Sequence, residues 1–467
     1  MREVFEICRI ILPAVYFLSL LLVLISASAF AQRPPTTPIN LSYLRIDFIQ
    51  PGARPAALGG AFIGAAQDET AAPINPAGLT YLKNAGTSLH QRNVRTSYEE
   101  PAGSPTTPNA RKRFHTNKFD QNMVSVFIPM SQFTLAIFRQ VIFDSRFNFD
   151  TPQFLTTNAK LFSRFVLGGL GNFPGRRVNL DLKLVHDAIA VGFTFSKRLS
   201  LGLTGKMSVL TFNLDEQTFL DSEVINGSSP RENTAETTYA ITTIDARKLK
   251  LSYSFGIMAK LIIDKLFVGA VINFNPTFDL KSHIFLPEYK IDSQILSSEL
   301  PRNTNFHLSV PDTYGFGFYY LAHSRLHFTF DLMRINYSDL LDGNDRNIVA
   351  DDAFNIQTGN YEDPDSEPDL KVEDVTQLHF GIEYLVKVPK LALIPLRFGV
   401  YTQPGHRIYA SGNDPDLRRL FPKAKDRVHT TFGLGIVFNS YLKFDGSIDV
   451  SADGFELIAS TLISVPF

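Results

Sequence analysis

Apolar and polar residues alternate along fourteen segments of this chain, and this periodicity constrains the fold more than any other feature of the sequence. Alternation with a period of two indicates β-strands, because successive side chains of a strand point to opposite faces. Between residues 442 and 450, for example, Leu442, Phe444 and Ile448 fall on one face, whereas Lys443 and Asp445 fall on the other. The predicted strands span residues 86–98, 119–130, 131–143, 182–196, 199–214, 247–262, 265–280, 305–322, 325–338, 374–388, 392–404, 427–439, 441–452 and 455–467.

The connections between these strands are alternately short and long. The short ones are 129–131, 196–198, 263–264, 322–324, 386–390 and 439–440, and the long ones cover 99–118, 144–181, 215–246, 281–304, 339–373 and 405–426. A soluble sandwich with one wet face would show the same alternation within its strands. Short turns at one end and long loops at the other are typical of outer-membrane barrels, and an even strand number returns both termini to one side. We therefore predict an all-β membrane protein, a 14-stranded antiparallel barrel.

The composition agrees with a membrane β-protein. The chain has 467 residues with 40 Phe, 16 Tyr and 19% charged residues, and no stretch after residue 31 offers the ~20 consecutive apolar residues of a spanning helix. A formal net charge of −1 gives no reason to expect a nucleic-acid partner. The last strand ends in Phe467, which resembles the recognition signal of the barrel insertion machinery. The predicted surroundings are thus outer-membrane lipid.

The first 31 residues are predicted to be a cleaved signal peptide. Arg2 and Arg9 precede an apolar run at 10–25, and Ala29 and Ala31 form a small-residue cleavage site. An uncleaved anchor helix is the alternative, although the apolar run is short. Cleavage would remove Cys8, the only cysteine, and leave no disulfide, thiol nucleophile or thiolate metal site.

The stretch from Arg54 to Leu79 is rich in small residues. Residues 56–66 suit a short helix, whose glycines allow close approach but weaken it by about 1 kcal/mol each. The Asn75-Pro76 dipeptide predicts a turn that ends any preceding helix. A small-residue turn and helix inside an ordinary core is the alternative interpretation.

This stretch resembles the N-terminal signature of the FadL/TodX outer-membrane transport proteins. The resemblance rests on Arg54, Leu58 to Phe62, Asp68, Thr70-Ala71 and Asn75 to Leu79. It implies a hatch at 32–85 inside a barrel at 86–467, and passive uptake of long-chain fatty acids or other hydrophobic compounds without cofactor or enzymatic step. The hatch residues implied are Asn75, Pro76, Ala77, Gly78, Leu79, Gly59, Gly60 and Phe62. Long loop insertions and the absence of Trp depart from the family pattern.

Charges on the polar strand faces are expected to line the lumen, because a charge facing lipid costs ~2–4 kcal/mol at mid-membrane. These charges are Lys206, Lys260, His327, Asp331, His379, Glu383, Arg397, Asp445 and Asp449. One interpretation is that they pair with one another and with the hatch. The other is that Lys206 or Arg397 binds the carboxylate of an amphipathic ligand through a charge-assisted hydrogen bond.

Arg139 interrupts the apolar face of the third predicted strand. A local kink or bulge would explain it, and family members release cargo through a lateral gate at a kink in this strand. We therefore predict a gate at residues 137–141, including Ile137 and Arg139. In the alternative, Arg139 extends its side chain to the membrane interface.

Two long loops are unexpectedly apolar. Phe162 and Phe165 belong to one of them, and Leu286 and Ile295 belong to the other. Exposed apolar patches often mark binding surfaces, so these loops are predicted to capture hydrophobic cargo. They could instead pack on each other as a lid.

Two further function classes stay open at this stage. A related branch of barrels with a similar hatch assists secretion by binding a protein partner, and an outer-membrane lipid hydrolase would need a close Ser–His pair on the outer face. The acidic run at 362–369 lacks the spacing of a calcium loop, so no metal is predicted.

Overall fold

The computed structural model describes residues 43–101, 111–152, 154–155, 172–173, 175–219, 238–262, 265–286, 289–291, 294–297, 300–341, 353–355, 360–362, 370–389, 392–412, 418, 421–438 and 441–465. The predicted signal peptide and the terminal Phe467 lie outside these residues. In the described part of the chain, no helix is both long and apolar enough to cross a membrane.

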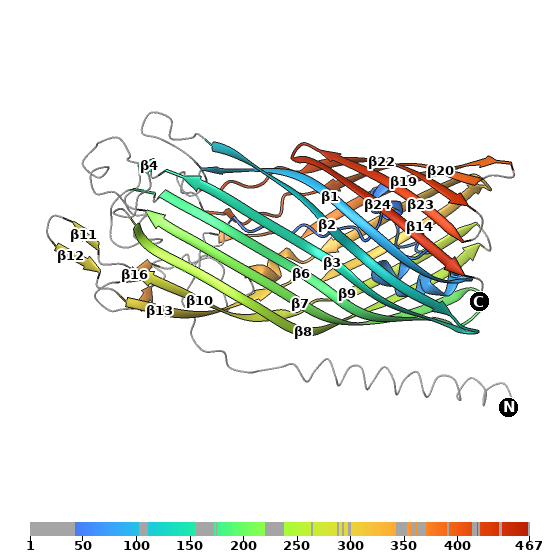
Figure 1. Cartoon of the computed structure of the whole chain (residues 1–467), viewed down its shortest axis with the longest axis horizontal. Coiled ribbons are helices and arrows are strands. Elements are labelled where there is room, and N and C mark those ends of the chain that lie inside the picture. Colours follow the sequence, from blue (N-terminus) through green and yellow to red (C-terminus); the bar gives the residue numbers. More distant parts are fainter. Residues whose placement is uncertain are drawn as a thin grey trace, which may run out of the picture. The chain divides into compact units, whose positions relative to one another are not determined.

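One large antiparallel sheet forms the wall of the molecule (Figure 1). Its sixteen strands are β1 (Ala85–Pro101), β2 (Arg111–Pro129), β3 (Phe133–Thr151), β6 (Gly175–Thr194), β7 (Leu199–Phe219), β8 (Thr238–Ile262), β9 (Leu266–Phe274), β10 (Thr277–Leu286), β13 (Leu300–Ser309), β14 (Thr313–His323), β15 (Leu326–Ile335), β19 (Val375–Val388), β20 (Ala392–Gln403), β22 (Arg427–Phe438), β23 (Leu442–Ser451) and β24 (Gly454–Val465).

Two wall strands are each interrupted once, so sixteen segments make fourteen strands. Both β9 and β10 pair with β8, and they continue each other across residues 275–276. Their partners β14 and β13 continue each other across residues 310–312. Because β1 also pairs with β24, the sheet has no free edge and closes into a barrel. The predicted 14-stranded membrane barrel is confirmed.

Short strand pairs lie at the end of the barrel where the long loops are found. They are β4 (Phe154–Leu155) with β5 (Asn172–Phe173), β11 (Tyr289–Ile291) with β12 (Gln294–Ser297), β16 (Ala353–Asn355) with β17 (Asn360–Glu362), and β18 (Leu370–Lys371) with β21 (Tyr409–Ala410). We refer to this end as the loop end and to the opposite end as the turn end.

Several strands extend further toward the loop end than the sequence predicted. The third strand runs to Thr151 instead of 143, and β8 begins at Thr238 instead of 247. The reason is a reversal of polarity along the strand, which β7 shows clearly. Its outward face changes from Leu201, Leu203 and Met207 to Asn213 and Asp215, while its inward face changes from Thr204, Lys206 and Ser208 to Leu210, Phe212 and Leu214.

The outward apolar belt of β7 therefore ends near Val209, after about the 9–11 residues that a strand needs to cross a bilayer. Beyond the belt the wall is polar outside and apolar inside, as in a water-soluble protein. A buried apolar core fills this part of the lumen. It includes Tyr43, Leu44, Ile46, Phe143, Phe212, Phe278, Phe306 and Tyr337.

The described chain before β1, residues 43–84, lies inside the barrel. An extended N-terminal segment, Tyr43–Gln50, precedes a compact hatch at residues 51–82, which Figure 1 shows in blue toward the turn end. The hatch contains α2 (Ala53–Ala57), α3 (Ala71–Ile74) and the 3-10 helix η1 (Pro76–Tyr81). A further 3-10 helix, η3 (Tyr337–Leu341), follows β15.

The predicted helix at 56–66 is wrong in extent, since α2 ends at Ala57. Gly59 and Gly60 adopt φ values of 64° and 76°, a left-handed conformation that favours glycine and turns the chain. The glycines that were expected to let a helix pack closely instead end it.

Candidate functional site

Glycines of the wall make room for the hatch. Each wall glycine that faces it leaves less than 3 Å between a hypothetical Cβ and a hatch atom, so any larger residue would collide there. Beside the turn at residues 75–77 these are Gly192, Gly202, Gly256 and Gly269, and beside α2 and the following turns they are Gly317, Gly381, Gly399 and Gly433. Several of these glycines pair directly across strands, as Gly192 does with Gly202 and Gly202 does with Gly256. The hatch thus packs against a band of wall backbone that carries no side chains.

Asn75 forms hydrogen bonds with two parts of the hatch and with the wall. Its side-chain amide donates to the carbonyl oxygen of Ile63 and to that of Ile257 on β8, both at 3.1 Å. Its Oδ1 accepts a hydrogen bond from the Ala77 amide at 3.2 Å and so caps η1. The residue is fully buried, and this geometry places the predicted hatch residues 75–79 against β6, β7 and β8.

Polar side chains of the wall hold the opposite side of the hatch. Asp331 Oδ2 accepts hydrogen bonds from the amides of Phe62 and Ile63 at 2.6 and 2.7 Å. His379 donates through Nδ1 to the Gly59 carbonyl oxygen at 2.6 Å, because a carbonyl can only accept. Of the predicted lumen charges, Asp331, His379 and Glu383 therefore hydrogen-bond directly to the hatch.

Six charged side chains form a closed ring between hatch and wall. Arg54 contacts Glu383 at 3.1 Å, Glu383 contacts Arg397 at 2.6 Å, and Arg397 contacts Asp445 at 2.6 Å. Lys443 then bridges Asp445 at 2.9 Å and Asp68 at 3.6 Å, and Asp68 returns to Arg54 at 3.2 Å. Charges alternate around the whole ring. Removing one member of such a buried network typically costs about 3–5 kcal/mol, because its partners stay buried and unpaired.

A seventh charged group, Glu69, adjoins this ring through Lys443 at 3.2 Å. Burial and the neighbouring Asp68 raise the pKa of Glu69 to about 7, although Lys443 acts in the opposite direction. Burial alone would raise the pKa of Asp68 too, but Lys443 and Arg54 lower it to about 2. Asp68 therefore carries the negative charge, and Glu69 accepts a proton near neutral pH.

The ring corrects one sequence-based prediction. Arg397 was a candidate for binding a ligand carboxylate, but its side chain is only 2% exposed and two carboxylates of the protein already occupy it. It contributes to the hatch contact instead. The sequence gives no sign of these pairings, because they join strands that are distant along the chain.

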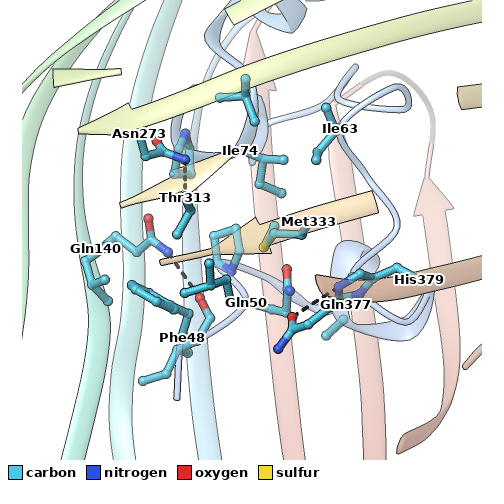
Figure 2. A pocket seen from close by; sticks show the side chains of 18 of the residues that line it. Phe48, Gln50, Ile63, Ile74, Gln140, Asn273, Thr313, Met333, Gln377 and His379 are labelled. Atoms are coloured by element: carbon cyan, nitrogen blue, oxygen red, sulfur yellow. Dashed lines mark hydrogen bonds between the residues drawn. The ribbon is translucent and has the colours of Figure 1, made fainter. Parts of the chain in front are cut away.

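A cavity of about 150 Å³ lies between the hatch, the N-terminal segment and the wall. Figure 2 shows Phe48 and Gln50 of the N-terminal segment among the labelled residues, with Gln140 on one side and Gln377 and His379 on the other. Apolar and polar side chains share its lining. The apolar ones include Ile63, Ile74, Phe138, Ile142, Val271, Met333, Ile335 and Ile458, and the polar ones include Gln140, His186, Lys206, Asn273 and Gln377.

Lys206 lines this cavity, as a ligand-binding role would require. Its Nζ donates to Asn273 Oδ1 at 3.2 Å, and no ion pair joins it to a carboxylate within the described residues. His186 lies beside it in the same lining, and its buried Nε2 has no hydrogen-bond partner in the described part of the chain. His186 was not among the residues predicted from the sequence to bind a ligand.

The wall beside the cavity contains a seam, which we define as the unpaired stretch between β2 and β3. Their ladder ends at the pair Met123–Gln140, although both strands continue to residues 111 and 151. A bulged residue follows that pair in each strand: Asn122 is adjacent to Met123 in β2, and Ile142 lies two residues after Gln140 in β3. Each bulge shifts the inward face by one residue. The two strands share no backbone ladder beyond this point.

The N-terminal segment and side chains bridge the seam from within. The Ile49 amide donates to the Ile142 carbonyl oxygen at 2.9 Å, and Asn122 donates to the Gln50 carbonyl oxygen at 2.6 Å. Further out, Lys118 of β2 forms an ion pair with Asp144 of β3. These individual hydrogen bonds and this ion pair stand in place of the continuous backbone ladder that joins the other wall strands.

The structure corrects the predicted position of the lateral gate. Arg139 has regular partners on both sides, Val124 and Asp187, and forms an ion pair of 3.1 Å with Asp187 on the outside of the barrel. Ile137 is likewise regularly paired with Val126 and Ile189. The irregularity lies beyond them, at Ile142. Arg139 keeps its place by pairing with Asp187 near the rim of the apolar belt, and no kink is needed to explain it.

Only some residues of the predicted cargo-capturing loops belong to the part of the chain that the structure describes. Phe162 and Phe165 lie outside the described residues. For Leu286 and Ile295 the structure gives the backbone pairings, with Leu300 in the β10–β13 ladder and with Lys290 in the β11–β12 hairpin. Their role in capture stays a prediction.

No protein-family model and no curated protein matches the sequence. Among solved structures, the chain is similar to that of a Pseudomonas aeruginosa FadL homologue, at 15% identity and a TM-score of 0.56 over 89% of this chain and 98% of that one.

Two hydrocarbon transport proteins show the same likeness. For the Pseudomonas putida toluene transporter TodX the identity is 14% and the TM-score 0.56, over 90% of this chain and 100% of that one. For the CymD monoaromatic hydrocarbon channel the values are 14% and 0.53, over 91% and 99%. The resemblance that the hatch sequence predicted is confirmed at the level of structure. The chain has the fold of the FadL and TodX transport proteins, a closed 14-stranded membrane barrel with an N-terminal hatch in its lumen.

Proposed function

We propose that this barrel lies in an outer membrane and transports hydrophobic compounds passively, with lateral release through the seam between β2 and β3. The observation that carries the proposal is the position of the cavity. Phe138, Gln140 and Ile142 line it from β3, so it adjoins the wall where the β2–β3 ladder ends. The similar structures include transporters named for toluene and monoaromatic hydrocarbons, which supports a hydrophobic cargo.

The hatch makes a straight axial route unfavourable. Its backbone fills the space beside the wall glycines, and the charge ring fixes it to β19, β20 and β23. Opening the axis would separate several buried ion pairs, at about 3–5 kcal/mol for each uncompensated charge. Opening the seam breaks two ion pairs, Lys118–Asp144 and Lys183–Asp120, together with the hydrogen bonds of the N-terminal segment and those between Tyr98 and Asn148. It leaves the hatch and its charge ring in place. The lateral route is therefore the easier one.

Long-chain fatty acids belong to the cargo that this route could carry. Their carboxylate would reach Lys206, and their tail, which is longer than the cavity, would extend past Ile142 into the seam. Transport would follow the concentration gradient, with no cofactor and no catalytic step. The N-terminal segment would have to leave the seam in each cycle.

Deleting Ile142 tests lateral release. The inward residues of β3 change from even numbers before this bulge to odd numbers after it, so the deletion restores one continuous inward face. We expect the β2–β3 ladder to extend past Gln140 and the uptake of radiolabelled hydrophobic compounds by cells to fall at least tenfold.

Ile142→Ala keeps the bulge and serves as the matched control, which should transport at a rate within about twofold of the unaltered barrel. Heat-modifiable gel migration would verify that both variants insert as folded barrels. Unchanged uptake by a folded deletion variant would show that cargo does not leave through the seam.

A further inference from the structure

We propose that the lumen cavity selects a compact carboxylate, an acid that carries one aromatic ring, over neutral hydrocarbons and long-chain acids. This inference rests on the proposed transport function and specifies its substrate. It is carried by two separate properties of the cavity, the chemistry of its nitrogen groups and its size.

The nitrogen groups call for an anion. Lys206 brings an ammonium into the lining, where its side chain is 5% exposed and only an amide oxygen of Asn273 accepts a hydrogen bond from it. Burying an ammonium costs free energy, and Asp312 attracts this one electrostatically without forming an ion pair with it. The carboxylates of the lining are held elsewhere, Asp449 by Tyr401 and His429 and Glu456 by Arg92. His186 is 3% exposed and offers a second nitrogen without a partner in the described residues. A carboxylate has two oxygens and can accept from both groups at once.

Other cations of the lumen do not compete for such a ligand. Arg54, Arg397 and Lys443 are all held in the charge ring by carboxylates of the protein. Lys260 lies over the rings of Tyr81 and Phe267, and it does not line the cavity. Within the described residues, Lys206 is the lysine that faces the cavity with spare donors.

The size of the cavity limits the rest of the ligand. An engineered apolar cavity of about 150 Å³ holds one benzene molecule, and this cavity has about the same volume. Phe48, Phe138 and Tyr401 supply aromatic faces or edges to the lining, opposite aliphatic side chains such as Met333. Aromatic rings pair favourably in offset and edge-to-face arrangements. One ring with one carboxylate fills this space, whereas the tail of a long-chain acid would exceed it.

Three probes separate the possible ligands: benzoate, toluene and palmitate. Binding to the full barrel in lipid nanodiscs would be measured by calorimetry, and uptake by cells that express it would be measured in parallel. We expect benzoate to bind most tightly and to be taken up fastest. In Lys206→Met, which keeps the side-chain volume, benzoate affinity should fall at least tenfold while toluene binding stays within about twofold.

Lys250→Met is the matched control, because Lys250 lies on the exposed face of β8 and pairs with Asp279. It should leave benzoate binding unchanged. Equal affinity for benzoate and toluene, tighter binding of palmitate, or an unaltered benzoate affinity in Lys206→Met would each overturn the inference. Transport of toluene or palmitate in such a case would leave the proposed function standing. If the cells took up none of the three probes, both proposals would fail.

Discussion

At the scale of single residues, the hatch depends on the absence of side chains. A Cβ at Gly202 would lie 2.1 Å from the Ala77 amide nitrogen, and one at Gly256 would lie 2.2 Å from Asn75 Oδ1. These glycines were visible in the sequence, yet strand periodicity treats glycine as neutral. Only the pairing of strands shows that they form one band. The motif at residues 75–79 predicted a hatch, but it gave no information about the wall surface that the hatch contacts.

Gly202→Ala should displace the turn at Asn75 and destabilise the seated hatch by about 1–3 kcal/mol, as overpacking typically does. Gly205→Ala is the control, because it lies on the same strand with nothing within 4 Å of its Cβ. Hydrogen exchange of the hatch amides would rise in the first variant and stay unchanged in the second. Equal protection in both would mean that the hatch does not rest on Gly202.

At the scale of elements, alternation predicted every wall strand, whereas contacts between elements could not be predicted. Arg139 was interpreted as a sign of a kink because its partner Asp187 lies on another strand. Arg397 was taken for a ligand-binding residue because the carboxylates that surround it come from β19 and β23. The N-terminal segment has no period of two to reveal its place, since it crosses the lumen as an isolated extended chain. Neighbours in space that are distant in sequence account for each of these differences.

Glu69 makes the contact between hatch and wall depend on pH. Its pKa in the folded barrel is about 7, above the ordinary value of 4.5, so the folded state binds the extra proton. Stability from this group is complete below about pH 4.5 and is lost as the pH rises to 7, by about 3 kcal/mol in all. We expect protection factors of the hatch amides to fall between pH 5 and pH 8.

Glu69→Gln should remove most of this pH dependence, because glutamine is neutral throughout the range and keeps the side-chain size. Glu373→Gln, at an exposed carboxylate near the loop end, is the control and should retain it. The same slope in Glu69→Gln as in the unaltered barrel would assign the pH dependence to another group.

At the scale of the whole molecule, the barrel consists of two regions whose inner and outer faces have opposite polarity. The turn-end part has a lipid-facing apolar belt and a polar lumen, and the loop-end part has a wet outer surface and an apolar core. Several strands were predicted to end where this polarity reverses, because the prediction followed one apolar face along each strand. Counting the period without regard to which face is apolar would have recovered their full length.

The boundary can be tested with two outward positions of β7. Leu203→Arg places a charge inside the apolar belt and should lower the free energy of unfolding in vesicles by about 2–4 kcal/mol. Asn213→Arg lies on the same face beyond the belt and should change it by less than about 0.5 kcal/mol. The urea midpoint of unfolding measures both. Similar losses in the two variants would place Asn213 inside the bilayer.

The enclosure of the N-terminal segment has a consequence for biogenesis. Tyr43, Leu44 and Ile46 belong to the loop-end core, together with buried residues of β3, β6, β7, β8, β10 and β13. The wall closes by pairing β1 with β24, the first and last wall strands in chain order. The sheet must therefore close around the N-terminal segment while that segment lies within it. The N-terminal segment precedes every wall strand in the chain, so it does not have to be inserted into a barrel that has already closed.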